Sequence, residues 1–181
     1  MFKKQVLQIL VNFMDVVKKM ESLGMAHGDL SGGNILIESN LSIKLIDYDG
    51  MFIPDLKKNS PPRENGTSGY QHKNRLNDSI RIYDETMDRF SILVIYLSLL
   101  AISEKPALFE KYRDTDTILF NKRDIENPDS RNSFGDSIFN DLQLLSPEIV
   151  KLTKELKNWC KLNDFTKHPK ILYRVTTPDN F

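Results

Sequence analysis

A short segment near the N-terminus carries side chains that could handle a phosphate and a proton. The run His27-Gly28-Asp29-Leu30-Ser31-Gly32-Gly33-Asn34 contains one acid and ends on an amide, and a second acid, Asp47, follows. An amide oxygen and a carboxylate are hard ligands suited to Mg²⁺, which retains water and takes up phosphate oxygens. A neighbouring carboxylate, Asp29, can accept a proton from an attacking hydroxyl. These are the parts that phosphoryl transfer requires.

The elements around this segment must bring its polar side chains together. Apolar residues at three-and-four spacing predict an amphipathic helix over 2–22, with Gly24 as its stop signal. Two short apolar runs, at 34–38 and 42–47, are separated by turn-forming residues and predict a β-hairpin. Because a hairpin folds its strand ends back on each other, Asn34 and Asp47 can converge.

The rest of the sequence predicts mostly helices. Residues 51–83 are expected to be irregular, since their prolines bar long helices. The segment 86–102 is apolar nearly all round, which predicts a buried helix. Further along we expect one or two short helices in 104–120, a loop over 121–136, a short helix over 137–145, a helix from Ser146-Pro147 to about 161 and a loose tail. The predicted fold class is therefore mainly α with a small β-hairpin.

Composition excludes several classes of function. The 181 residues include 25 Lys and Arg and 25 Asp and Glu, so the net charge is zero. A zero balance predicts neither a nucleic-acid partner nor a polybasic membrane anchor. No apolar stretch reaches the roughly 20 residues that a bilayer requires. The single cysteine, Cys160, fits a reducing compartment, and we expect a cytoplasmic protein.

The chemistry-bearing segment resembles a known family. His27 to Asn34, followed by Asp47-Tyr48-Asp49-Gly50, resembles the catalytic loop H-R-D-L-x-x-x-N and the D-F-G motif of the protein-kinase-like superfamily. The resemblance implies that Asp29 is the catalytic base. It implies that Asn34 and Asp47 hold Mg²⁺ and the nucleotide ATP, with Asp49 as a further metal ligand.

The same resemblance implies structural roles for one histidine and one further aspartate. His27 corresponds to a histidine that packs and hydrogen-bonds in the family core. Asp88, near the start of the buried helix, resembles an aspartate that hydrogen-bonds the catalytic-loop backbone. Without the resemblance, Asp88 is interpreted as an acid stabilised by the N-terminus of a helix.

The resemblance covers most of the chain. It implies that residues 1–163 form the C-lobe of a protein-kinase-like domain and that 164–181 are a C-terminal tail. Within the lobe it assigns the catalytic loop to 27–34, the metal-binding strand to 42–50, the activation-like segment to 51–84 and the buried central helix to 86–102. Gly66-Thr67-Ser68-Gly69-Tyr70 resembles the end of the activation segment.

Several positions depart from the protein-kinase pattern. Gly28 replaces the Arg that docks an activation-loop phosphate in many kinases, which argues against that form of switching. Ser31 replaces a common Lys, so a charge that would steady the transferred phosphate is absent. His27-Gly28-Asp29 and the Asp47-x-Asp49 spacing are more similar to small-molecule phosphotransferases, such as aminoglycoside and choline kinases.

The parts that cover ATP in the family, namely a Gly-rich loop, a strand Lys and its Glu partner, precede the catalytic loop. The short sequence before His27 contains none of them, and none of the eight glycines forms G-x-G-x-x-G. We therefore expect phosphoryl transfer to a hydroxyl of a protein Ser or Thr only when an N-lobe or a partner chain is supplied. The alternatives are a catalytically silent, kinase-derived binding module and a small-molecule phosphotransferase.

Overall fold

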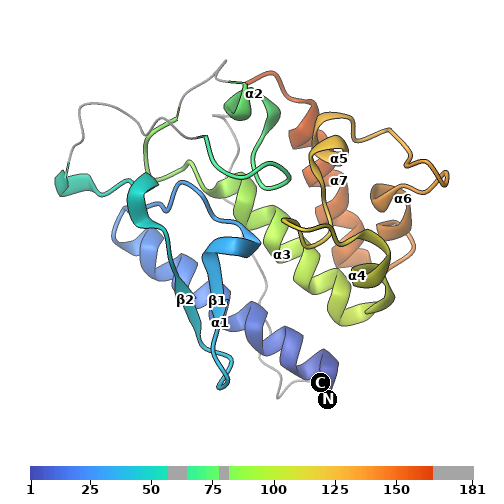
Figure 1. Ribbon diagram of the computed structural model, residues 1–181, viewed down its shortest axis with the longest axis horizontal. Helices are drawn as coiled ribbons and strands as arrows, with labels where there is room; N and C mark the ends of the chain where they lie inside the picture. Colours follow the sequence, from blue (N-terminus) through green and yellow to red (C-terminus); the bar gives the residue numbers. More distant parts are fainter. Residues whose placement is uncertain (57–64, 78–81, 165–181) are drawn as a thin grey trace.

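The computed structural model describes residues 1–56, 65–77 and 82–164 (Figure 1). Within these ranges the chain is mainly helical with one two-stranded antiparallel sheet, so the predicted fold class is confirmed. The α-helices and strands are α1 (Phe2–Ser22), β1 (Ile35–Ile37), β2 (Ile43–Leu45), α2 (Lys73–Leu76), α3 (Arg89–Glu104), α4 (Ala107–Tyr112), α5 (Lys122–Glu126), α6 (Ile138–Leu142) and α7 (Pro147–Lys161). Short 3-10 helices lie at Gly32–Asn34, Tyr48–Gly50 and Pro54–Leu56.

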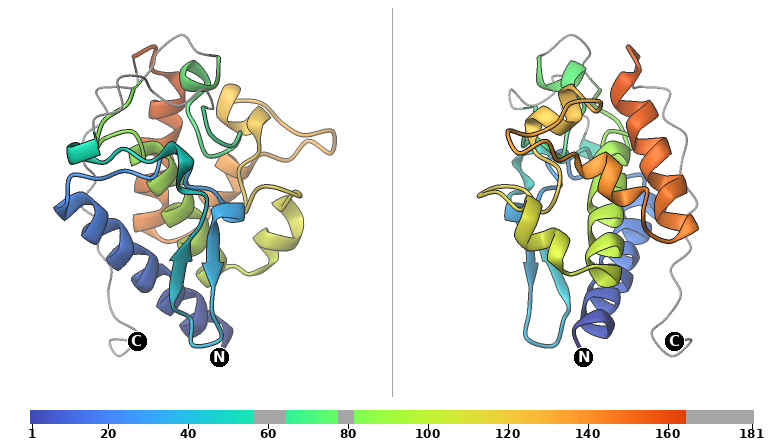
Figure 2. Two further views of the ribbon diagram at one scale, coloured as in Figure 1. Left: turned by 60° about the vertical axis from the view of Figure 1, so that its left-hand side comes forward. Right: turned by 90° about the vertical axis from the view of Figure 1, so that its right-hand side faces the viewer.

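Helix α3 is the centre of the fold. It packs against α1 on one side and α7 on the other, and the hairpin lies alongside α1 (Figure 2). Its side chains are apolar nearly all round, so it can be stable only when covered on most faces. Leu93 and Leu97 are completely buried, which agrees with the sequence prediction of a buried helix.

Helix α1 lies on α3 through one apolar stripe. Val6, Leu10, Phe13 and Val17 recur at helical spacing and are all buried. The helix ends where predicted, because Gly24 adopts a φ of +63°, a conformation that costs glycine little. This turn directs the chain into the segment that carries His27.

The predicted hairpin forms, with shorter strands than expected. The register pairs Ile35 with Leu45 and Ile37 with Ile43. One further bond extends the ladder, since the backbone N–H of Ile46 donates to the carbonyl of Asn34 at 3.0 Å. Asn34 and Asp47 therefore leave the sheet at the same end.

Two boundaries differ from the sequence prediction. The central helix begins at Arg89, not at 86, because Asp84 accepts hydrogen bonds from the N–H and the hydroxyl of Thr86 and holds a turn there. The predicted loop over 121–136 contains α5. Its start is a capping box, in which Asn121 and Asp124 satisfy each other's backbone N–H groups, and the buried Ile125 anchors it.

The segment expected to be irregular contains the short helix α2. His72 caps it, since Nδ1 accepts the backbone N–H of Asn74 at 3.1 Å. At the other end of the chain α7 begins at Pro147 after Ser146, as predicted. The predicted loose tail lies outside the described residues.

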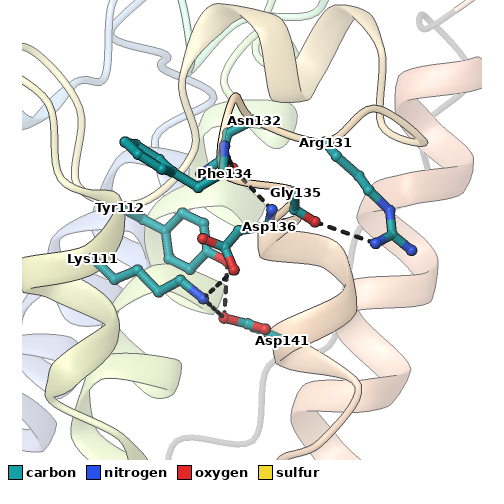
Figure 3. A network of polar contacts seen from close by, with 8 residues as sticks. All are labelled: Lys111, Tyr112, Arg131, Asn132, Phe134, Gly135, Asp136 and Asp141. Atoms are coloured by element: carbon teal, nitrogen blue, oxygen red, sulfur yellow. Dashed lines mark hydrogen bonds and ion pairs between the residues drawn. The ribbon is translucent and has the colours of Figure 1, made fainter.

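A polar network joins α4 to α6 at the surface (Figure 3). Lys111 Nζ contacts Asp136 at 2.8 Å and Asp141 at 2.9 Å, and the hydroxyl of Tyr112 donates to the same Asp141 carboxylate at 2.8 Å. Partial burial and this carboxylate raise the pKa of Tyr112. The network braces the loop that precedes α6, on which Phe134 is 88% exposed.

Across the described ranges, no helix has both the length and the apolar character that crossing a membrane would require.

Candidate functional site

Asp29 is the acid around which the site is built. Its side chain is half-buried and accepts three hydrogen bonds. The backbone N–H of Thr67 donates to Oδ1 at 2.7 Å, while the Thr67 hydroxyl and Asn34 Nδ2 donate to Oδ2 at 3.2 and 3.0 Å. Both carboxylate oxygens are therefore held in one orientation, and a proton acceptor in a fixed orientation is what general-base chemistry needs.

Asn34 joins this acid to the hairpin. Its Nδ2 donates to the backbone carbonyl of Asp29 at 2.9 Å as well as to the carboxylate. Because both donations come from the amide nitrogen, Oδ1 is the oxygen that can act as a ligand. The Asn34 carbonyl accepts the N–H of Ile46, one residue before Asp47. The structure thus brings the predicted pair to one end of the hairpin.

The two acids after the second strand are exposed. Asp47 has a φ of +63°, which is uncommon for a residue with a side chain, and it precedes the 3-10 turn that contains Asp49. A backbone held in such a conformation re-aims the side chain relative to an ordinary strand. The backbone of this turn begins at the same end of the hairpin as Asn34.

The oxygen set fits Mg²⁺ chemically but not as a complete protein cage. Carboxylate and amide oxygens are the ligands that Mg²⁺ takes, and it usually keeps several waters and phosphate oxygens. Throughout the part of the chain that the structure describes, no group of three or more His, Cys, Asp or Glu side chains converges as a metal site. Asn34 and Asp47 therefore fit a metal whose remaining ligands are water and the phosphate oxygens of a nucleotide.

His27 is buried and supports the loop. Its Nε2 lies 2.9 Å from the carbonyl of Ile46, and its Nδ1 accepts the N–H of Asp29 at 3.3 Å. A ring whose Nδ1 accepts must carry its proton on Nε2, so the two contacts agree on one neutral tautomer. His27 thereby ties the acid-bearing loop to the strand that leads to Asp47.

Asp88 fixes the same loop from the start of α3. Its fully buried carboxylate accepts the backbone N–H of His27 at 2.5 Å and that of Gly28 at 2.9 Å. Burial raises the pKa of Asp88, while the two N–H donors and the charge of Arg75 oppose that rise. Asp88 does not cap its own helix through its side chain, and its carboxylate is directed instead to the backbone N–H groups of His27 and Gly28.

Gly28 occupies a place that no larger residue can take. Its φ is +87°, and a Cβ there would lie 2.5 Å from the carbonyl oxygen of Gly50 and 2.9 Å from the Met87 side chain. The close approach accompanies the backbone pairing of Ala26 with Phe52. Glycine at this position is therefore required sterically.

Sequence reasoning missed two polar residues that contact this loop and a third, Gln71, that contacts one of them. Thr67 bonds to Asp29, and Arg75, with Gln71 beside it, donates to the Gly28 carbonyl at 2.7 Å. The Gly66-Thr67 pair was the available signal for the first. No spacing rule marks Arg75, because its contact joins residues 47 positions apart.

Comparisons with known proteins give a partial relationship to kinases. No family model matches the sequence. A stretch of 46 residues is 39% identical to "Serine/threonine-protein kinase ppk8" of the fission yeast Schizosaccharomyces pombe. The match covers 25% of this chain and 9% of the yeast protein, so it spans a small part of its curated relative. It indicates a relationship to kinases and nothing finer.

Proposed function

We propose that this chain carries the phosphoryl-transfer site of a protein-kinase-like enzyme, which moves a phosphoryl group from ATP to a hydroxyl of a protein Ser or Thr. The observation that carries the proposal is the shared hydrogen bonding of Asp29 and Asn34, with Asp47 at the same hairpin end. The partial match to a serine/threonine kinase supports the same reaction class. We also propose a cytoplasmic location, in keeping with the single buried Cys160.

Each side chain has one task in this proposal. Asp29 orients the acceptor hydroxyl and takes its proton at Oδ1, which accepts one hydrogen bond, from the Thr67 N–H, and keeps a free lone pair. Asn34 and Asp47 would hold Mg²⁺, and Asp49 would add a contact to the metal or the substrate. The metal would supply charge neutralisation on the phosphates. His27 and Asp88 hold the loop in place.

In this scheme the phosphates of the nucleotide need a second set of protein contacts. Phosphate-binding parts of the kind found on a kinase N-lobe would come from additional sequence or from a partner chain. Residues 1–181 alone are therefore expected to bind Mg-ATP weakly and to transfer little phosphate. Isothermal titration of this segment would contradict that expectation by showing micromolar affinity for Mg-ATP.

The direct test uses the full-length gene product. Transfer of labelled phosphate from Mg-ATP to a serine and threonine peptide library is measured for the wild type and for Asp29→Asn and Asp47→Ala. Both variants should lose transfer while their circular dichroism is unchanged. Asp15→Asn, which alters an exposed acid on α1, serves as the matched control and should transfer normally. Wild-type turnover in Asp47→Ala would overturn the assignment.

A second candidate is a catalytically silent binding module. The observation that favours it is that Thr67 and Asn34 already donate three hydrogen bonds to Asp29, which leaves one carboxylate lone pair, on Oδ1, for an acceptor hydroxyl. A third, transfer to a small molecule, follows from the His27-Gly28-Asp29 sequence. Including aminoglycosides and choline beside the peptides separates these outcomes, since a silent module phosphorylates none of them.

A further inference from the structure

Arg75 is a buried cation whose hydrogen bonds to described residues go to two backbone carbonyls and one side-chain amide, and not to an acid. It is 4% exposed on the short helix α2. Its Nη2 donates to the carbonyl of Gly28 at 2.7 Å, and its Nη1 donates to the carbonyl of Met87 at 3.0 Å and to Gln71 Oε1 at 2.9 Å. Burying an arginine is costly, so a guanidinium placed here is held by specific acceptors.

The Gly28 carbonyl belongs to the same peptide unit as the N–H of Asp29. Arg75 holds the oxygen of this unit, while His27 Nδ1 accepts its N–H at 3.3 Å. The preceding peptide unit is held by Asp88, which accepts the N–H of Gly28. A peptide unit is planar, so fixing both its ends fixes the direction in which Asp29 leaves the backbone.

The Met87 carbonyl gives Arg75 a second point of attachment, immediately before Asp88. The guanidinium therefore bridges the catalytic-loop backbone to the start of α3. Its charge lies within electrostatic reach of both Asp88 and Asp29. Arg75 thus sits between the acid that holds the loop and the acid that the loop presents.

Gln71 connects this bridge to the loop that contacts Asp29. It is 1% exposed, its Oε1 accepts from Arg75, and its Nε2 is buried with no hydrogen-bond partner among the described residues. A Cβ on Gly66 would lie 2.8 Å from that Nε2 and 2.9 Å from Asp29 Oδ1. The unpaired amide therefore points into the same small space as the Asp29 carboxylate.

We propose that Arg75 is a positioning residue that orients Asp29 through the Gly28–Asp29 peptide unit, with Gln71 aligning its guanidinium. The inference rests on the proposed function and deepens it. The cation is supplied from within the activation-like segment, 51–84, and its acceptor on the loop is the backbone carbonyl of Gly28. Donor and acceptor are both groups of the chain itself, so this contact does not depend on a phosphate.

The experiment compares Arg75→Met and Arg75→Lys in the full-length gene product by steady-state kinetics. Arg75→Met should lower kcat by about tenfold to a hundredfold with a KM for the acceptor that changes less than about twofold, because misorientation of a reacting group acts on the chemical step. Arg75→Lys should recover part of kcat, since an ammonium can still donate to the Gly28 carbonyl. Gln71→Leu should give an intermediate loss.

A readout that does not depend on turnover is amide hydrogen exchange of the same variants. In Arg75→Met, protection of the Gly28 and Thr67 N–H groups should fall at least about tenfold beyond any fall at amides of α7. Ile149→Ala, which creates a cavity at a buried position of α7, is the matched control, because it destabilises the fold from a different element. It should lower protection generally, with no excess at Gly28.

The two proposals fail in different ways. If the wild type transfers no phosphate to any acceptor, the proposed function fails, and exchange at Gly28 and Thr67 alone decides the role of Arg75. If Arg75→Met keeps wild-type kcat, or if its exchange pattern matches that of Ile149→Ala, the positioning role is overturned. Equal losses of kcat in the Lys and Met variants, with general loss of protection, would also reduce Arg75 to a fold-stabilising residue.

Discussion

The hydroxyl and the backbone N–H of Thr67 both donate to the carboxylate of Asp29, at 3.2 and 2.7 Å. The two residues are 38 positions apart in sequence. A carboxylate bonded in this way is fixed in direction, yet one of its contacts is a hydroxyl of the kind that the proposed acceptor would bring. In the proposed reaction, Thr67 therefore affects both the orientation of Asp29 and its capacity to accept a proton.

Replacing Thr67 by valine should lower kcat by about tenfold. The change removes the hydroxyl bond to a charged group and leaves the backbone bond in place. Thr67→Ser retains both donors and should stay close to the wild type. Peptide phosphorylation by the full-length protein measures the effect. A rise in turnover for the valine variant would instead identify the contact as an inhibitory cap.

Replacing Asp88 by asparagine should destabilise the fold by about 1–3 kcal/mol. One carboxylate oxygen becomes an amide nitrogen that cannot accept, which leaves the N–H of His27 or Gly28 buried and unpaired. Urea unfolding measures the loss. Asp114→Asn, on an exposed turn, is the control and should change stability by no more than about 0.5 kcal/mol. Equal stability of the two variants would contradict the role given to Asp88.

A paired glycine experiment separates backbone strain from a steric clash. Gly28 and Gly135 have nearly the same φ, +87° and +84°, but a Cβ at Gly135 would meet nothing within 4 Å. Gly135→Ala should therefore cost about 1 kcal/mol from conformation alone. Gly28→Ala should cost at least about 2 kcal/mol more, because the new Cβ collides with the Gly50 carbonyl. Thermal unfolding of both variants checks the difference, and equal costs would disprove the close approach.

Stability should fall between pH 7 and pH 5 because of His72. Burial lowers the pKa of His72 to about 4, against an ordinary value of 6.5, and its Nε2 and Nδ1 contact Trp159 and Asn74. The unfolded chain thus binds the proton first, so stability present above pH 6.5 is lost as the pH falls toward 4. The expected loss between pH 7 and pH 5 is about 2 kcal/mol.

The control for this pH effect is His72→Gln, which cannot titrate. Asp88 also titrates with a raised pKa, and its contribution has the opposite sign, because a buried carboxyl is relieved as it gains a proton. The difference between the wild type and His72→Gln removes that contribution. Urea unfolding at both pH values should show a smaller fall for the variant. Parallel pH curves would assign the effect to other groups.

The sequence was sufficient to predict the local part of the site. Asn34 and Asp47 flank a hairpin whose short turn and alternating residues set their spacing, so pattern rules could bring them to one end. Helices α1 and α3 were likewise visible from their apolar periodicity. The capping-box residues of α5, Asn121 and Asp124, are also present in the sequence. The polar composition of 121–136 nevertheless favoured the prediction of a loop.

The remaining contacts of the site could not be predicted from local patterns. Thr67 and Arg75 reach the loop from segments that approach it only through tertiary packing, and a single hydrogen bond leaves no periodic trace. The need for glycine at position 28 likewise depends on where the Gly50 carbonyl lies. For Asp88 the resemblance led us to expect hydrogen bonds to the loop backbone, whereas its position before a helix suggested an interaction with the helix N-terminus.

The long sequence separation between Asp88 and the residues that it contacts also affects the order in which parts of the site form during folding. Its acceptor contact with His27 spans 61 residues, and that contact holds a loop bounded by a helix and a hairpin which can each form locally. Closing so large a loop must precede any gain from the contact. The helices and the hairpin are therefore expected to form early, and the acid-bearing loop to take its final shape only when α3 docks, as one of the last events of folding.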